Sequence, residues 1–114
     1  MMIEMLKAKI HRATVTDANI NYEGSITISS EILKKSNIKE YEKVLVVDIN
    51  NGSRFETYVI ESDAPNMICV NGAAARLVSI GDKVIIMSFV CMNEDSAANH
   101  RPIIVHVDEN NSPT

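Results

Sequence analysis

Tyr22-Glu23-Gly24-Ser25-Ile26-Thr27-Ile28 is the stretch around which the rest of the chain is organised. At its centre, the Ser25 hydroxyl lies next to the backbone carbonyl of Gly24. Such a hydroxyl can attack the carbonyl and shift the acyl group from nitrogen to oxygen. The resulting ester can eliminate to dehydroalanine, which hydrolyses to a pyruvoyl group. Glycine at position 24 suits this chemistry, because the attack needs a strained and uncrowded turn. Most Gly-Ser pairs are ordinary turns, so this pair alone does not indicate self-cleavage, and the surrounding sequence is needed to distinguish the two possibilities.

The composition favours one small globular domain with an aliphatic core. The chain has 114 residues, enough for a single domain over 1–114, and 46 % of them are hydrophobic. Only three Tyr and two Phe are present, so Ile, Val, Leu, Met and Ala must build the core. A net charge of −4 argues against a general nucleic-acid binder, which needs a basic surface.

The sequence also predicts a cytoplasmic protein that neither spans a membrane nor binds a metal. No apolar run approaches the roughly 20 residues of a membrane span. Glu4 and Lys7 interrupt the N-terminus before a signal peptide could form. Cys69 and Cys91 lack metal-ligand spacing, and we expect two free core cysteines in a reducing compartment.

Period-two alternation predicts a mainly β fold with little helix. In 5–16, Leu6, Ala8 and Ile10 lie on one face of a strand, and lysines and a histidine lie on the other. The β-branched run 43–49 predicts a strand buried on both faces, and Asn51-Gly52 predicts a hairpin turn into a return strand. Further strands are expected at 25–28, 54–61, 67–70, 83–90 and 102–107.

Two short helical segments and a polar tail complete the predicted elements. Ser29 or Ser30 can cap a helix over 31–35, and Asn37 can end it. A helical turn is expected over 73–77, and the polar tail 108–114 is expected to fray.

One weak internal repeat suggests two similar halves. Ile38 followed by 42–46 resembles Ile80 followed by 82–86, each with an acidic turn, a lysine and a β-branched run. Two such halves suit a pseudo-symmetric closed barrel, which leaves no exposed edge strands. The repeat could also arise because any two buried strands look alike.

The candidate functional residues are cations and hydroxyls, because no zinc signature, phosphate-binding loop or dinucleotide motif is present. Lys9 and His11 share one strand face, and Arg54 and Tyr58 share another. Strand lysines and arginines are usually solvated, and a lone strand histidine is usually structural. The residues alone therefore leave their roles open.

Together, five stretches of the sequence resemble the family of bacterial aspartate 1-decarboxylases. They occur in the family's order and spacing and span about Met5 to about Pro102, although the loop between Tyr58 and Asn71 is one residue shorter and the tail after Pro102 does not match closely. The stretches are Lys9-Ile10-His11-Arg12, Tyr22 to Ile28, Asn51-Gly52-Ser53-Arg54-Phe55-Glu56-Thr57-Tyr58, Val70-Asn71-Gly72-Ala73-Ala74-Ala75 and Gly81-Asp82-Lys83-Val84-Ile85-Ile86.

The resemblance implies a self-processing enzyme with a small closed double-psi β-barrel and one or two short helices. Cleavage at Gly24–Ser25 would give chains 1–24 and 25–114, with a pyruvoyl group made from Ser25 as the covalent cofactor and no metal. The family is a cytoplasmic homotetramer with active sites between subunits. It converts L-aspartate to β-alanine and CO₂ for pantothenate synthesis.

The resemblance also implies residue roles, which we state as expectations. The pyruvoyl group of Ser25 would form a Schiff base with aspartate, and Tyr58 would donate a proton to the carbanion. Thr57 would contact substrate and polarise the Gly24 carbonyl during cleavage, and His11 is a candidate for self-processing. Gly72-Ala73-Ala74 would form a substrate-binding backbone loop.

A physical argument assigns the two cations. A salt bridge to the departing carboxylate would stabilise the ground state more than the transition state. We therefore expect Arg54 to bind the retained side-chain carboxylate in a bidentate manner, assisted by Lys9.

Two other functions remain open from the residues. One is a non-enzymatic small β-barrel that binds a ligand or partner, with Gly24–Ser25 an ordinary turn. The other is a pyruvoyl decarboxylase for a different amino acid, against which Lys9 and Arg54 argue. Intact mass under denaturing conditions separates the first from a self-cleaving enzyme.

Overall fold

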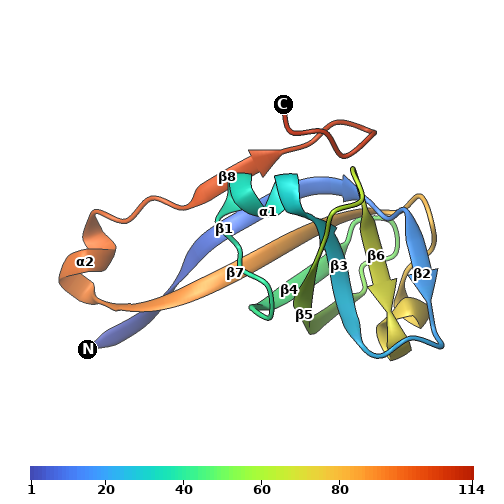
Figure 1. The fold of residues 1–114 in the computed structure, drawn as a ribbon. Helices are drawn as coiled ribbons and strands as arrows, with labels where there is room; N and C mark the ends of the chain where they lie inside the picture. The colour runs from blue at the N-terminus through green and yellow to red at the C-terminus, as the bar shows by residue number, and fades with distance from the viewer.

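One eight-stranded mixed sheet dominates the computed structural model, which describes residues 1–114 (Figure 1). The order of neighbouring strands is β2-β6-β3-β5-β4-β7-β1-β8. The strands are β1 (Met2–Thr14), β2 (Asp17–Asn19), β3 (Ser25–Ser29), β4 (Lys43–Asp48), β5 (Arg54–Ser62), β6 (Ile68–Asn71), β7 (Lys83–Asn93) and β8 (Ile103–His106). The helices are α1 (Ser30–Ser36), the 3₁₀ helix η1 (Gly72–Leu77) and α2 (Glu94–Ala98). A mainly β fold is thus confirmed, and α1 and η1 lie where the two helical segments were predicted. Helix α2 was not predicted, and closure into a barrel stays a prediction.

The position of β3 in the sheet matters most for function. It pairs in parallel with β5 and antiparallel with β6. Its first residue, Ser25, lies opposite Asn71 of β6, and Ile26 lies opposite Val59 of β5. These pairings bring residues about 30 to 45 positions apart in sequence to the start of one strand.

The long strands β1 and β7 form an antiparallel ribbon that extends beyond the other strands, with α2 at its far end (Figure 1). The ribbon contributes to overall dimensions of 43 × 28 × 25 Å. Met2 and Phe89 on this ribbon are large exposed hydrophobic residues.

The core is aliphatic, as the composition predicts, and is built from inward-facing strand residues. Its fully buried large side chains are Ile10, Val15, Ile26, Ile28, Ile32, Ile38, Val44, Val46, Val59, Ile68, Val70 and Ile86. The prediction that the strand at 43–49 is buried on both faces is wrong. Val44 and Val46 are buried, but Leu45 and Val47 are only half-buried, because nothing in the chain fully covers the outer face of β4.

Helix α1 ends where the sequence predicts but does not begin with the predicted cap. Asn37 adopts a left-handed conformation (φ 58°) at the C-terminus, as a helix stop requires. Ser29 occupies the N-cap position without a side-chain capping hydrogen bond. Ser29 is also the last residue of β3, and its hydroxyl is buried away from any hydrogen-bond partner.

The internal repeat is present in the structure as two equivalent turns before β4 and β7. The carboxylate of Glu42 accepts from the backbone N–H of Lys39 at 2.9 Å, and the carboxylate of Asp82 accepts from that of Ser79 at 3.0 Å. The residue before each acidic residue has positive φ, 71° at Tyr41 and 96° at Gly81. The repeat therefore reflects matching local structure.

The tail and the cysteines differ from expectation. Instead of fraying, 108–114 turns back, and the buried Asn111 side chain accepts from the Thr14 N–H at 2.7 Å and donates to the carbonyls of Thr14 and Asn66. Both cysteines are free, but Cys91 is exposed and Cys69 is half-buried. No helix in the structure has both the length and the apolar character needed to cross a bilayer.

Candidate active site

Ser25 is buried and has a backbone conformation that non-glycine residues rarely adopt. The residue is 3 % exposed and its φ is 152°. A non-glycine residue at positive φ stores strain, which at functional sites can be part of the mechanism. We expected glycine at position 24 to supply the unusual conformation, and this expectation is wrong. Gly24 has no positive φ, and a Cβ added there would meet no atom within 4 Å, so the strain lies on the serine.

The Asn71 side chain holds the Ser25 hydroxyl in place. Asn71 Nδ2 donates to Ser25 Oγ at 3.1 Å and to Thr27 Oγ1 at 3.0 Å. Its Oδ1 accepts from the Cys69 thiol at 3.2 Å. Burial raises the pKa of Cys69, and the Asp17 charge raises it further, so the thiol keeps the proton it donates. The sequence motif contains Asn71, but only the structure reveals its contact with Ser25.

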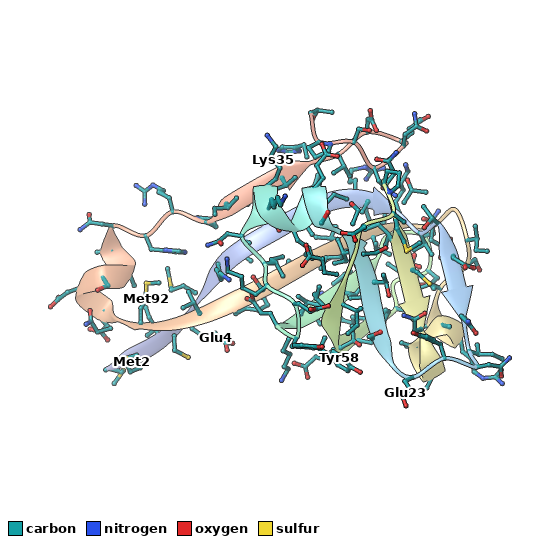
Figure 2. The ribbon with its side chains drawn as sticks, viewed as in Figure 1. Met2, Glu4, Glu23, Lys35, Tyr58 and Met92 are labelled. Carbon is teal, nitrogen blue, oxygen red and sulfur yellow. The ribbon has the colours of Figure 1, made fainter.

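A small cavity of about 110 Å³ lies beside Ser25 and brings it together with Tyr58. The register of β3 and β5 explains the contact, since Ile26 lies opposite Val59 and the preceding residues are therefore neighbours. In Figure 2, Tyr58 and Glu23 both lie near the lower edge of the molecule. The residues that line the cavity are Tyr22, Glu23, Gly24, Ser25, Thr27, Tyr58 and Ile60.

The Gly72-Ala73-Ala74 loop begins η1 directly after Asn71 and touches the Gly24–Ser25 segment. A Cβ added at Gly72 would lie 2.8 Å from Gly24 Cα. The predicted substrate loop and the predicted cleavage site are therefore neighbours within one chain.

Thr57 lies next to Tyr58 on β5 but does not line the Ser25 cavity. It lines a neighbouring cavity of about 340 Å³ together with Lys43, Glu56 and Tyr58. Tyr58 thus lines both cavities, whereas Ser25 lines only the first and Thr57 only the second.

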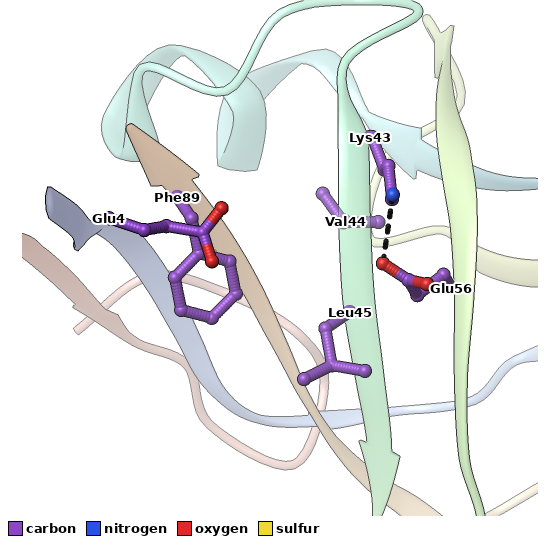
Figure 3. A pocket seen from close by; sticks show the side chains of 6 residues that line it. All are labelled: Glu4, Lys43, Val44, Leu45, Glu56 and Phe89. Atoms are coloured by element: carbon purple, nitrogen blue, oxygen red, sulfur yellow. Dashed lines mark ion pairs between the residues drawn. The ribbon is translucent and has the colours of Figure 1, made fainter. Parts of the chain in front are cut away.

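A third cavity, of about 310 Å³, continues this surface toward β1 and β7 (Figure 3). Lys43 and Glu56 form an exposed ion pair of 3.0 Å between the two cavities. Exposed pairs of this kind contribute little stability. The remaining lining residues are Glu4, Val44, Leu45 and Phe89.

Lys9, His11 and Arg54 do not line the Ser25 cavity. Three strands separate β1, which carries Lys9, from β3 in the sheet. Arg54 is four residues before Tyr58 on β5, about 13 Å along an extended strand.

His11 lies instead beside His106, with ring centroids 5.6 Å apart, in another cavity of about 310 Å³. Burial lowers the pKa of His11, and the charges of Lys9, His106 and Arg12 lower it further. The structure does not bring His11 to the bond that it was expected to help cleave.

Comparison with known proteins assigns the chain to a family. The family model described as aspartate decarboxylase matches residues 1–114. The chain is 58% identical to the aspartate 1-decarboxylase of Clostridium kluyveri over 113 residues, covering 98% of this chain and 89% of that protein. It is 58% identical to that of Campylobacter fetus over 111 residues (97% and 96%), and 55% identical to that of Campylobacter jejuni over 114 residues (100% and 90%). Because the family model and these relatives match nearly the whole chain, the chain belongs to the aspartate decarboxylase family.

Proposed function

We propose that this chain is the precursor of a pyruvoyl-dependent aspartate 1-decarboxylase, which converts L-aspartate to β-alanine and CO₂ for pantothenate synthesis. Family membership supports the reaction, and the strained, hydrogen-bonded Ser25 beside Tyr58 supports the chemistry. The single domain 1–114 would become chains 1–24 and 25–114. Two free cysteines suit the reducing cytoplasm.

The self-processing step starts at the Ser25 hydroxyl. Ser25 Oγ forms a bond to the Gly24 carbonyl carbon, the Gly24–Ser25 C–N bond breaks, and the hydroxyl proton passes to the released amine. Elimination then expels the Gly24 carboxylate and leaves dehydroalanine, which water converts to the pyruvoyl ketone and ammonia. Since Asn71 donates to Ser25 Oγ, the hydroxyl proton stays free to leave.

The residues around Ser25 fit a pyruvoyl group at this position. When formed, the group supplies an electron sink for the electrons released as the α-carboxylate leaves. Asn71 Nδ2 donates to Ser25 Oγ, the atom that leaves with Gly24 in the elimination, so the amide would lie beside the newly formed group, and Tyr58 lines the same cavity. Tyr58 then holds the proton for the product carbon, and a positioned acid of this kind contributes roughly 10²–10⁴-fold.

The retained carboxylate of aspartate is bound by Arg54 and Lys9, with Thr57 and the Gly72-Ala73-Ala74 loop as further contacts. Neither cation lines the Ser25 cavity of its own chain. A neighbouring copy therefore supplies Arg54, Lys9 or both to the Ser25 cavity. A homotetramer with active sites between subunits would allow this. The half-exposed apolar face formed by Leu45, Phe89 and Ile104 offers a surface for such contacts.

The strained Ser25 beside Asn71 and Tyr58 is the observation that carries the proposal, and replacement of Ser25 tests it. The purified wild type should give a fragment of residues 1–24 and a blocked larger fragment by denaturing mass spectrometry, and should form β-alanine from aspartate. Ser25→Ala should stay whole at 12.6 kDa and make no β-alanine. Ser88→Ala is the matched control, because it removes an equally buried hydroxyl that has no hydrogen-bond partner.

The control should cleave and react like the wild type. An intact, inactive wild type would favour a non-enzymatic binding module. β-Alanine formation by Ser25→Ala would disprove the pyruvoyl mechanism.

A further inference from the structure

Gly72 is in close contact with the backbone at the bond that is to be cleaved. A Cβ built at Gly72 would lie 2.8 Å from Gly24 Cα, 2.9 Å from Gly24 N and 3.2 Å from the carbonyl oxygen of Tyr22. All three are backbone atoms, so no flexible side chain could move aside. Any residue larger than glycine must displace the Tyr22–Gly24 segment or the start of η1.

The other glycines do not share this contact. Added Cβ atoms at Gly24, Gly52 and Gly81 would meet nothing within 4 Å. Gly52 has nearly the same φ as Gly72, 76° against 72°. A side chain is therefore disfavoured by positive φ at both positions, but only at Gly72 would its Cβ collide with backbone atoms.

The consecutive residues Asn71 and Gly72 thus contact the two residues of the Gly24–Ser25 peptide bond. Asn71 pairs with Ser25 across β3 and β6 and donates to its hydroxyl at 3.1 Å. Gly72 contacts Gly24, whose carbonyl carbon the hydroxyl must attack. Displacement of Gly24 would separate the carbonyl from a nucleophile that Asn71 keeps in place.

We propose that Gly72 is a positioning residue for self-cleavage, in addition to its place in the substrate loop. Its missing side chain lets Gly24 lie within reach of Ser25 Oγ. This inference rests on the proposed self-cleavage at Gly24–Ser25. Gly72 acts at the attack of the hydroxyl on the carbonyl, which precedes every later step of pyruvoyl formation.

The test compares Gly72→Ala with Gly52→Ala in the full-length chain. Freshly purified precursor is incubated, and the fraction cleaved is followed by denaturing electrophoresis and mass spectrometry. A small misplacement of reacting groups can cost on the order of 10²-fold in rate, so we expect Gly72→Ala to cleave at least about 10-fold more slowly than Gly52→Ala. Circular dichroism checks that both variants are folded.

Hydroxylamine distinguishes positioning for attack from an effect on a later step. It cleaves the ester that forms between Gly24 and the Ser25 side chain, and so releases 1–24 as a hydroxamate. Gly72→Ala should not accumulate hydroxylamine-sensitive chain, because formation of the ester is the step that is slowed. A merely destabilised protein that still forms the ester would release the fragment, and this result would overturn the proposal.

Equal cleavage rates for Gly72→Ala and Gly52→Ala would also overturn it, while leaving the proposed function intact. Failure of the wild type and Gly52→Ala to cleave would instead disprove the proposed function. If Gly72→Ala does not fold, the rates are compared in trimethylamine oxide, an osmolyte that favours the folded state. Slower cleavage of Gly72→Ala than of Gly52→Ala would then support the proposal, and equal rates would overturn it.

Discussion

At the scale of single residues, the reactive position is defined by a chain of hydrogen bonds. The Cys69 thiol donates to the Asn71 amide oxygen, and the amide nitrogen donates to Ser25 Oγ. If the amide turned over, its oxygen would accept the Ser25 proton and keep it from leaving. Cys69 therefore favours the amide orientation that the proposed attack of Ser25 Oγ requires.

Replacement of Cys69 tests this orientation. Cys69→Ala removes the donor, and we expect self-cleavage to slow by about 5- to 10-fold, in keeping with the loss of one hydrogen bond. Cys69→Ser keeps a donor and should cleave at nearly the wild-type rate, when the fraction cleaved is followed over time. Cys91→Ala, which removes the exposed cysteine, is the control and should behave as wild type. Equal rates for the Ala and Ser variants at position 69 would rule out the orienting role.

At the scale of elements, the hairpin of β4 and β5 depends on a buried carboxyl. Asp48 is fully buried, and its Oδ1 accepts from the backbone N–H groups of Asn50 and Asn51 at 2.8 and 3.2 Å. Burial raises the pKa of Asp48 above its ordinary value of 3.8, and the neighbouring Asp82 carboxyl raises it further. The protonated form is therefore favoured by folding.

Asp48 should make stability fall as pH rises. A group whose pKa is raised in the folded state contributes stability below its unfolded pKa and loses it as pH rises through the folded pKa. Asp48→Asn keeps an oxygen acceptor for the turn and cannot ionise. The unfolding free energy of the wild type relative to Asp48→Asn should thus decrease from pH 4 upward, measured by urea denaturation at several pH values. Parallel pH curves for the two proteins would contradict this account.

At the scale of the whole molecule, one chain does not bring all the residues of the proposed active site together. Lys9 and Arg54 do not line the Ser25 cavity, and the ribbon of β1 and β7 leaves large hydrophobic residues exposed. Both observations support an assembly in which neighbouring copies complete each other's sites.

Mixed assemblies provide a direct test of shared sites. Lys9→Ala should cleave itself but turn over aspartate poorly, and Ser25→Ala should be uncleaved and inactive. If a site combines Ser25 of one copy with Lys9 of another, co-expression of both variants should restore activity to about a quarter of wild type, as random pairing in a closed oligomer requires. No recovery, or a monomer by light scattering, would place both residues in one chain's site.

Local sequence signals determined much of the architecture of this protein. Alternation along β1 separates buried Ala8 and Ile10 from the outward Lys9, as predicted. Asn37 ends α1 in the left-handed conformation expected of a helix stop. These features depend on residues a few positions apart, which is why the sequence is sufficient to predict them. The motifs around Ser25 also pointed correctly to the family.

Tertiary structure alone decided the elements and contacts that depend on distant partners. The short strand β2 carries no strand pattern and exists through its pairing with β6. Ser25 is strained and held by Asn71, 46 positions away, and the tail is fixed by Asn111, whose contact to Thr14 spans 97 positions. Whether a glycine position has room for a Cβ atom also depends on residues distant in sequence. The backbone of Gly24 leaves no such room at Gly72, whereas Gly24 itself has room for one. Such contacts follow from how strands pair and pack, and no local pattern of residues encodes them.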